Sequence, residues 1–231
     1  MNCDATEVNK FSALAPRWWD RNGPCAPLHI LNKCRVQFIQ RHTDLANKTV
    51  LDVGCGAGIL TESLAMLNAN ICGLDASDAV IQEATAHATT QGLNITYYSA
   101  TIETLAETHN SKFDVITCME LLEHVPNPDK LIFDCMQLLK PGGKLFLSTL
   151  NRTLRSYALA IIGAEYLFNI LPKQTHDYKK FISPAELNSM LQATNMRLMA
   201  LDGVKYNPFT KSASFTSDLS VNYLAFATKE I

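Results

Sequence analysis

Short apolar runs alternate with amphipathic segments along the first two thirds of the chain. The runs that are short and rich in β-branched or aromatic residues predict strands at 49–53, 71–74, 95–98, 113–119 and 144–149. The segments in which apolar residues recur every three or four positions predict helices at 30–41, 59–67, 77–91 and 129–140. Ser77 is a suitable N-cap, and the Pro141-Gly142-Gly143 turn is expected to close the last of these helices. Strand-then-helix units in succession are typical of a parallel, doubly wound α/β sheet.

The C-terminal part of the chain has a different order of elements. The pattern there predicts a helix followed by two strands, at 184–194, 196–201 and 221–228. Together with the earlier strands this gives a mixed sheet of seven strands in a Rossmann-like α/β fold. We expect one domain over 1–231, with an N-terminal helical cap at 1–47 and an inserted lid segment at 151–182.

Composition narrows the class of protein. The 231 residues are 47% hydrophobic and 18% charged, which is typical of a globular chain, and the net charge of −2 gives no general attraction to nucleic acid. The seven cysteines are odd in number and form no C-x-x-C pair, so we expect neither a disulfide framework nor a cysteine zinc site. No apolar secretory signal is recognisable at the N-terminus, and the longest apolar stretch, 157–172, is too short to span a bilayer. These features favour a cytoplasmic protein.

A glycine-rich loop follows the first predicted strand. Residues 51–58 read LDVGCGAG, so Asp52 lies near the end of the strand and Gly54, Gly56 and Gly58 let the backbone approach a ligand closely. Asp75, twenty-one residues after Gly54, ends the second strand, where a carboxylate can accept hydrogen bonds from both hydroxyls of a ribose. The alternative is a tight turn and an unrelated surface aspartate. The two features at the ends of adjacent strands favour a nucleoside-binding site.

The spacing of the glycines distinguishes between nucleosides. The dinucleotide pattern G-x-G-x-x-G would need glycine at Ile59, whereas G-x-G-x-G resembles the first motif of class I S-adenosylmethionine-dependent methyltransferases. The sequences at 113–116 and 139–143 resemble the same superfamily, and a nicotinamide dehydrogenase is the alternative enzyme. The Asn/Asp-Pro-Pro-aromatic tetrapeptide usual in methyltransferases of base amines is missing from 118–128, which disfavours methylation of DNA.

Three polar residues follow the fourth predicted strand. Glu120, Glu123 and His124 stand at positions i, i+3 and i+4, so on a helical turn they would share one face. A phenol with a pKa of about 10 must lose its proton before it attacks a methyl group, through a general base or a divalent cation. The triplet can serve either purpose, with Mg²⁺ suited to the carboxylates. The alternative is that Glu123 and His124 only decorate a short solvated helix.

Longer stretches of the sequence, from about 18 to 228, resemble one family. They are WWD at 18–20, PLH at 27–29, LDVGCGAGILT at 51–61, CME at 118–120, EHVP at 123–126, LSTLNR at 147–152, GAEY at 163–166, THD at 175–177 and YNP at 206–208. The family is the ubiquinone-biosynthesis O-methyltransferases, which methylate two catechol-type intermediates of that pathway. Ala57 and Gln174 stand where glycine is common, and neither difference touches the expected chemistry.

The resemblance implies roles for particular residues. Arg35, Gly54, Asp75 and Met119 would contact S-adenosylmethionine, Arg35 through the cofactor carboxylate and Met119 through the adenine. A plain core methionine is the alternative for Met119. We add the two neighbouring loop positions, Asp52 and Gly56, to the predicted cofactor site. Glu120, Glu123 and His124 would hold Mg²⁺ in family members that use the metal, and His124 is the candidate base.

The predicted insertion has its own charge and polarity. Between 152 and 180 it carries five Lys or Arg and two acidic residues, around an apolar centre at 157–171. That pattern suits an interfacial helix on an anionic membrane, where a polyprenylated catechol or quinol substrate would reside. We therefore expect peripheral attachment to the inner face of the membrane, with a ubiquinone-biosynthesis complex as a further partner. A lid helix or a dimer contact is the alternative for the segment. A cofactor-binding scaffold, or a methyltransferase for another small acceptor, is the alternative for the whole chain.

Overall fold

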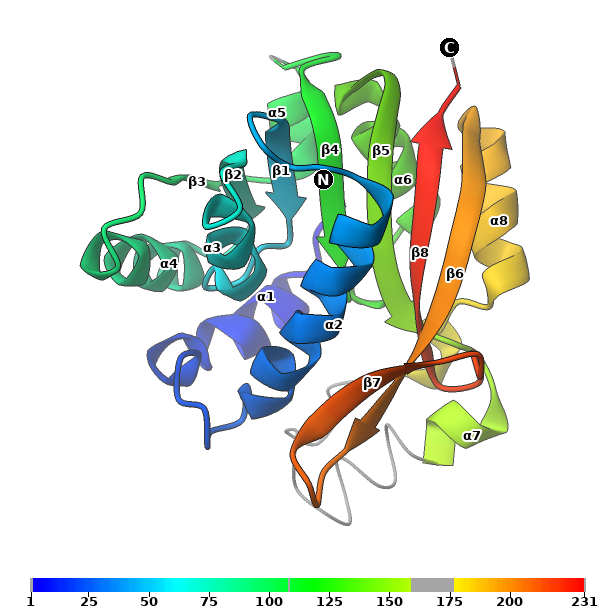
Figure 1. Ribbon diagram of the computed structural model, residues 1–231, viewed down its shortest axis with the longest axis horizontal. Helices are drawn as coiled ribbons and strands as arrows, with labels where there is room; N and C mark the ends of the chain where they lie inside the picture. Colours follow the sequence, from blue (N-terminus) through cyan, green and yellow to red (C-terminus); the bar gives the residue numbers. More distant parts are fainter. Residues whose placement is uncertain (1, 108, 159–176, 231) are drawn as a thin grey trace.

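The computed structural model describes residues 2–107, 109–158 and 177–230, and within them eight strands form one mixed sheet (Figure 1). The strands are β1 Thr49–Val53, β2 Asn70–Asp75, β3 Thr96–Ser99, β4 Phe113–Met119, β5 Leu139–Leu150, β6 Met196–Asn207, β7 Ser212–Thr216 and β8 Asn222–Lys229. Their order is β3-β2-β1-β4-β5-β8-β6-β7, and the first five are parallel. β8 is antiparallel to both β5 and β6, and β7 is antiparallel to β6. The predicted Rossmann-like class of fold with a mixed sheet is confirmed.

The number of strands differs from the prediction, because the sheet has eight strands rather than seven. The additional strand is β7, which forms a hairpin with β6 at the edge of the sheet. Its sequence, SASFT, contains only one large apolar residue, and none of its five residues is fully buried. An edge strand with one partner and little burial leaves a weak hydrophobic pattern, so the alternation that identifies a strand is missing.

Helices cover both faces of the sheet. The longer ones are α1 Ala5–Ser12, α2 Ala26–His42, α4 Asp78–Thr90, α6 Pro128–Leu138 and α8 Pro184–Ala193, and the shorter ones are η1 Ala15–Arg17, α3 Ile59–Ala65, α5 Ile102–Ala106, η2 Leu122–His124, α7 Leu154–Ser156 and η4 Tyr178–Lys180. Figure 1 shows α2 crossing in front of the sheet and α6 behind it. One apolar cluster joins α2 and α3 to the front face, and another joins α5, α6 and α8 to the back. The carboxyl ends of the parallel strands therefore meet beneath α1 and α2.

The predicted turn between the fourth helix and the fifth strand is not a separate turn. Helix α6 ends at Leu138 instead of residue 140, and β5 begins at once with Leu139. Along β4, Phe113 is opposite Leu139 but Val115 is opposite Lys144, so residues 140–143 form an irregular bulge. Pro141 has no N–H to donate, and Gly142 adopts a φ of 71°. The Pro-Gly-Gly run is therefore accommodated as a bulge at the start of the strand.

The predicted insertion falls mostly outside the described residues, so the lid or lipid helix at 157–171 and the position of Gln174 have no structural account. Within the described ranges, no helix combines the length and the apolar composition needed to cross a bilayer. Just before residue 159, among the residues that the structure describes, Leu154 is 83% exposed and Tyr157 is 41% exposed.

Candidate functional site

The glycine loop connects β1 to α3 at the carboxyl edge of the sheet. Gly54, Gly56 and Gly58 all have positive φ angles, of 69°, 54° and 88°. At Gly56 a Cβ atom would lie 2.4 Å from the Trp18 ring, which packs over the loop from the N-terminal segment. A residue other than glycine is therefore excluded there by both backbone conformation and space. The loop places its backbone N–H groups at the edge where ligands bind in such sheets.

Asp75, at the end of β2, contacts this loop directly. One carboxylate oxygen accepts a hydrogen bond from the Gly56 N–H at 3.1 Å, and the other accepts one from the Ser77 N–H at 3.0 Å. Burial raises the pKa of the Asp75 carboxyl, and the backbone hydrogen bonds oppose that rise. The structure thus brings together the two features that the sequence identified at the ends of adjacent strands. The carboxylate retains lone pairs for a ligand.

Asp52 lies deeper than the other predicted cofactor residues. It is 2% exposed, and its two carboxylate oxygens accept hydrogen bonds from the hydroxyls of Thr61 and Thr117, each at 2.6 Å. These bonds tie the end of β1 to α3 and to β4. Burial raises the pKa of Asp52 to about 6, against the lowering effect of the two threonines. Its contact with cofactor stays a prediction, while its position supports the glycine loop from beneath.

The raised pKa of Asp52 predicts a pH-dependent stability. A carboxyl whose pKa is higher in the folded than in the unfolded chain stabilises the fold fully below the unfolded value of about 4, and that contribution is lost as the pH rises to about 6. The Asp52→Asn variant lacks this titration. Urea unfolding of both proteins should therefore show the wild type losing free energy of unfolding relative to the variant between pH 4 and pH 6. If the free energies of unfolding of the two proteins change in parallel between pH 4 and pH 6, the raised pKa of Asp52 is contradicted.

Arg35 and Glu120 form an ion pair above the end of β4. Arg35 projects from α2, is 6% exposed, and has its Nη2 atom 2.6 Å from Oε1 of Glu120. Glu120 has a φ of 53°, a left-handed conformation that is uncommon for a side chain other than glycine and marks local strain. Met119, the residue before it, is 8% exposed and belongs to the apolar cluster beneath α2. This position suits a core methionine, and its contact with adenine stays a prediction.

The three residues of the predicted metal site have separate partners. Glu120 contacts Arg35, while Oε2 of the buried Glu123 accepts a hydrogen bond from the Thr149 hydroxyl at 2.9 Å. Nδ1 of His124 lies 2.9 Å from Oε2 of Glu7 on α1, and this bond lowers the pKa of Glu7 to about 2. Burial raises the pKa of Glu123. The 3₁₀ helix η2 covers only 122–124, so the helical turn that would align Glu120 with the other two is missing.

A metal ion does not fit this arrangement. Nowhere in 2–107, 109–158 and 177–230 do three or more His, Cys, Asp or Glu side chains lie close enough together to hold one. The metal role of Glu120, Glu123 and His124 stays a prediction, and we derive no chemical step through Mg²⁺.

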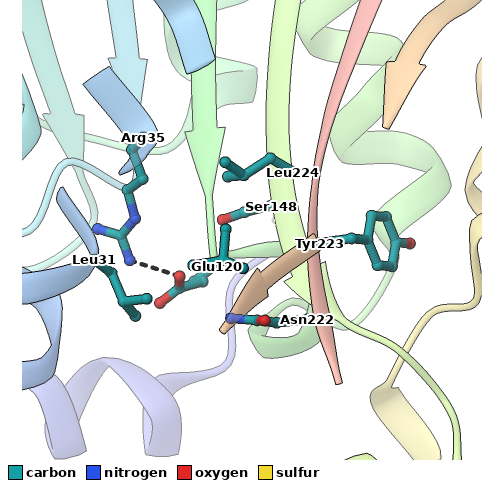
Figure 2. A pocket seen from close by; sticks show the side chains of 8 residues that line it. Leu31, Arg35, Glu120, Ser148, Asn222, Tyr223 and Leu224 are labelled. Atoms are coloured by element: carbon teal, nitrogen blue, oxygen red, sulfur yellow. Dashed lines mark ion pairs between the residues drawn. The ribbon is translucent and has the colours of Figure 1, made fainter. Parts of the chain in front are cut away.

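A small pocket opens beside the ion pair, between α2 and the sheet. Its lining consists of Leu31, Arg35, Glu120, Ser148, Val204, Asn222, Tyr223 and Leu224. Figure 2 shows Arg35 and Glu120 on one side, with Ser148 and Asn222 opposite them. Sequence reasoning missed Ser148 and Asn222. Ser148 lies near the end of the strand predicted at 144–149 and within the family-like stretch at 147–152, which is a usable signal. No local pattern connects Asn222 with Arg35 and Glu120, which lie far from it in the sequence.

Comparison with known proteins gives consistent matches. A family model described as a methyltransferase domain matches residues 28–201. Two curated relatives named ubiquinone biosynthesis O-methyltransferase are similar to the whole chain. The relative from Nitrosococcus oceani is 49% identical, and the match covers 100% of this chain and 98% of the relative. The relative from an Azoarcus species is 47% identical, and the match covers 99% of this chain and 98% of the relative. Among solved structures, a magnesium protoporphyrin IX methyltransferase from Synechocystis with bound SAH has a TM-score of 0.72 at 20% identity, covering 98% of this chain and 100% of that one. At 20% identity this structural similarity supports the class of fold alone.

Proposed function

This chain belongs to the family of ubiquinone biosynthesis O-methyltransferases, and from that membership we propose that it transfers the methyl group of S-adenosylmethionine to phenol or catechol hydroxyls of polyprenylated ubiquinone precursors, in both O-methylation steps. The observation that carries the proposal is an identity of nearly one half over the full length of relatives with that name. The glycine loop and Asp75, joined by a hydrogen bond at the carboxyl edge of the sheet, support it from the structure.

The residues at that edge suit the parts of S-adenosylmethionine. The Arg35 guanidinium is buried, and its Nε atom has no hydrogen-bond partner among the described residues, so it can donate to the cofactor carboxylate. Asp75 has lone pairs for the ribose hydroxyls, and its hydrogen bond to the Gly56 N–H places the glycine loop beside them. Met119 would contact the adenine. The cofactor itself supplies the methyl group on an activated sulfonium.

The transfer forms one bond and breaks one. A lone pair of the acceptor oxygen forms the new O–CH₃ bond, while the S–CH₃ bond breaks and its electron pair stays on sulfur. The phenolic proton must leave, and His124 is the candidate acceptor. Nδ1 of His124 lies 2.9 Å from Oε2 of Glu7, which is the arrangement of a histidine base oriented by a carboxylate. The protein's main contribution is to align the two reactants and to exclude water.

The direct test is incubation of the pure protein with S-adenosylmethionine labelled in the methyl group and a short-tailed demethylated quinol, followed by mass spectrometry. We expect one labelled methyl group on the quinol oxygen. An unlabelled quinol would refute the proposed reaction.

A raised melting temperature with S-adenosylhomocysteine but not with NADH separates methyl transfer from dehydrogenase chemistry. Full activity of the His124→Ala variant would eliminate His124 as the acceptor of the phenolic proton.

We propose that the enzyme is cytoplasmic and works at the inner face of the membrane, in contact with other enzymes of the pathway. The exposed Leu154 and Tyr157, with Arg155 between them, support this attachment beside the apolar segment at 157–171. Flotation with anionic liposomes should recover the wild-type protein, because apolar and basic side chains together favour an anionic surface. The Leu154→Asp/Tyr157→Asp variant should float several-fold less, while Met66→Asp, an exposed control in the C-cap of α3, should float like the wild type. Equal flotation of all three would contradict attachment through this segment.

A further inference from the structure

The wall of the pocket opposite Arg35 is formed by side chains from two antiparallel strands. Ser148 on β5 is directly opposite Leu224 on β8, so both project from the same face of the sheet. Asn222 lies two residues before Leu224 on β8 and shares that face. Tyr223, between them, turns to the other face, where its hydroxyl donates to the backbone carbonyl of Ile182 at 2.9 Å (Figure 2). The face turned toward α2 therefore combines one hydroxyl and one carboxamide with aliphatic side chains.

Polar atoms in this pocket have no protein partner. The Ser148 hydroxyl is buried on a residue that is only 4% exposed, and it forms no hydrogen bond within the part of the chain that the structure describes. Oδ1 of Asn222, on a partly buried residue, and Nε of Arg35 are also buried atoms without a hydrogen bond among the described residues. A buried polar group without a partner costs free energy and is uncommon in native proteins. Because Nε of Arg35 is assigned to the cofactor carboxylate, the Ser148 hydroxyl and Oδ1 of Asn222 are the two groups that point to a further ligand.

The pocket lies next to the predicted reaction centre. Ser148 is opposite Met119 in the parallel pairing of β4 and β5, and its backbone carbonyl accepts a hydrogen bond from the Glu120 N–H at 3.0 Å. The pocket is thus in contact with the end of β4, where Arg35 is predicted to hold the cofactor carboxylate.

The chemistry of the lining specifies the ligand. Oδ1 of Asn222 can only accept a hydrogen bond, so the ligand needs a donor, while the Ser148 hydroxyl can donate to the same ligand atom. A hydroxyl group satisfies both at once. Leu31, Val204 and Leu224 complete the lining with aliphatic surface. The free space is about 10 Å³, which is room for one hydroxyl-sized group, so the pocket would hold the hydroxyl of an aromatic acceptor and not its ring.

We propose that Ser148 and Asn222 form a subsite for the second hydroxyl of an ortho-dihydroxy acceptor, the one that is not methylated. Oδ1 of Asn222 accepts a hydrogen bond from that hydroxyl, and the Ser148 hydroxyl donates one to its oxygen. Anchored in this way, the ring presents the neighbouring oxygen to the methyl group. The two residues are specificity determinants and take no part in the bond changes. This inference rests on the proposed function, because it assumes that the acceptor is a catechol or quinol.

The test compares two acceptors that differ by one hydroxyl: a short-tailed alkylcatechol and the corresponding alkylphenol. In Ser148→Ala and in Asn222→Ala, kcat/KM for the catechol should fall about tenfold, the effect of one hydrogen bond, while the value for the phenol should stay within twofold. Ser214→Ala, at an exposed position of β7, is the matched control and should change neither. Melting temperature provides a second readout. Ser148→Ala should melt at the wild-type temperature or higher, because it removes a buried hydroxyl that has no partner.

Three results would overturn the subsite. Equal losses of kcat/KM for the catechol and the phenol would show that the variants affect the site in general. A lower melting temperature of Ser148→Ala would show that this serine has a structural role. A fall in affinity for S-adenosylhomocysteine would assign the pocket to the cofactor. If the wild type methylates neither acceptor, the proposed function fails instead. Calorimetric binding of the catechol to the wild type and to Ser148→Ala then still decides the subsite, since a loss of about tenfold supports it and equal affinities refute it.

Discussion

Replacing Arg35 with methionine is expected to lower the affinity for S-adenosylhomocysteine by at least about 100-fold. The guanidinium is 6% exposed, and its Nε atom lacks a partner among the described residues. Hydrogen bonds between charged groups in a buried site contribute about 1.5–3 kcal/mol each, so the loss of two corresponds to two or more factors of ten. Methionine keeps an unbranched apolar side chain and removes the charged guanidinium. Titration calorimetry measures the affinity directly.

Two further variants make the Arg35 result specific. Arg41→Met changes the same helix at an exposed arginine that pairs with Asp202, and it should leave the affinity within twofold. Arg35→Lys keeps the charge but cannot form a bidentate pair, and it should fall between the wild type and Arg35→Met. Melting temperatures separate binding from folding, because the removal of Arg35 leaves the Glu120 carboxylate without its ion pair. A change in affinity of less than threefold in a folded Arg35→Met protein would contradict the assignment.

The parallel half of the sheet was predictable because its signals are local. Strand β4 runs from Phe113 to Met119, as its apolar run predicted. The Ser77 side chain caps α4 by accepting from the Val80 N–H, also as predicted. The family resemblance is confirmed by the full-length relatives. Buried parallel strands and capped helices leave hydrophobic and polar patterns within a few residues, so a single sequence reports them.

The candidate site was predictable only in part, since its geometry depends on contacts between distant segments. The proximity of the Gly56 backbone to Asp75 was predictable, because the glycine loop and Asp75 follow two adjacent strands. The pairing of His124 with Glu7 did not, because it joins residues 117 positions apart through the N-terminal helix. The left-handed backbone at Glu120 also has no sequence signature. It separates Glu120 from the other two members of the predicted triplet, and a helical spacing argument cannot anticipate it.

The N-terminal segment connects the fold to the proposed chemistry. Trp18 packs on Gly56, the Ser12 hydroxyl is 2.7 Å from that of Ser77, and Glu7 holds His124. One short stretch of chain therefore contacts the glycine loop, the N-cap of α4 and the candidate base. Because these contacts lie over the carboxyl edge, the segment also helps to exclude water from the predicted cofactor site. The surroundings of the candidate base and of the glycine loop thus depend on residues far from either predicted motif.

The second large effect is expected at Asp75, where Asp75→Ala should weaken binding of S-adenosylhomocysteine by about 100-fold. Each carboxylate oxygen has two lone pairs, and the Gly56 and Ser77 N–H groups use one on each oxygen. The remaining lone pairs can accept the two ribose hydroxyls, and two such bonds contribute about 3 kcal/mol together. Asp75→Asn keeps the shape but turns one acceptor into a donor, so we expect a loss of about tenfold. Asp78→Ala, at the exposed start of α4, should bind like the wild type. If calorimetry finds Asp75→Ala within twofold of the wild type, the ribose is held elsewhere, and the pairing of the glycine loop with this aspartate serves only the fold.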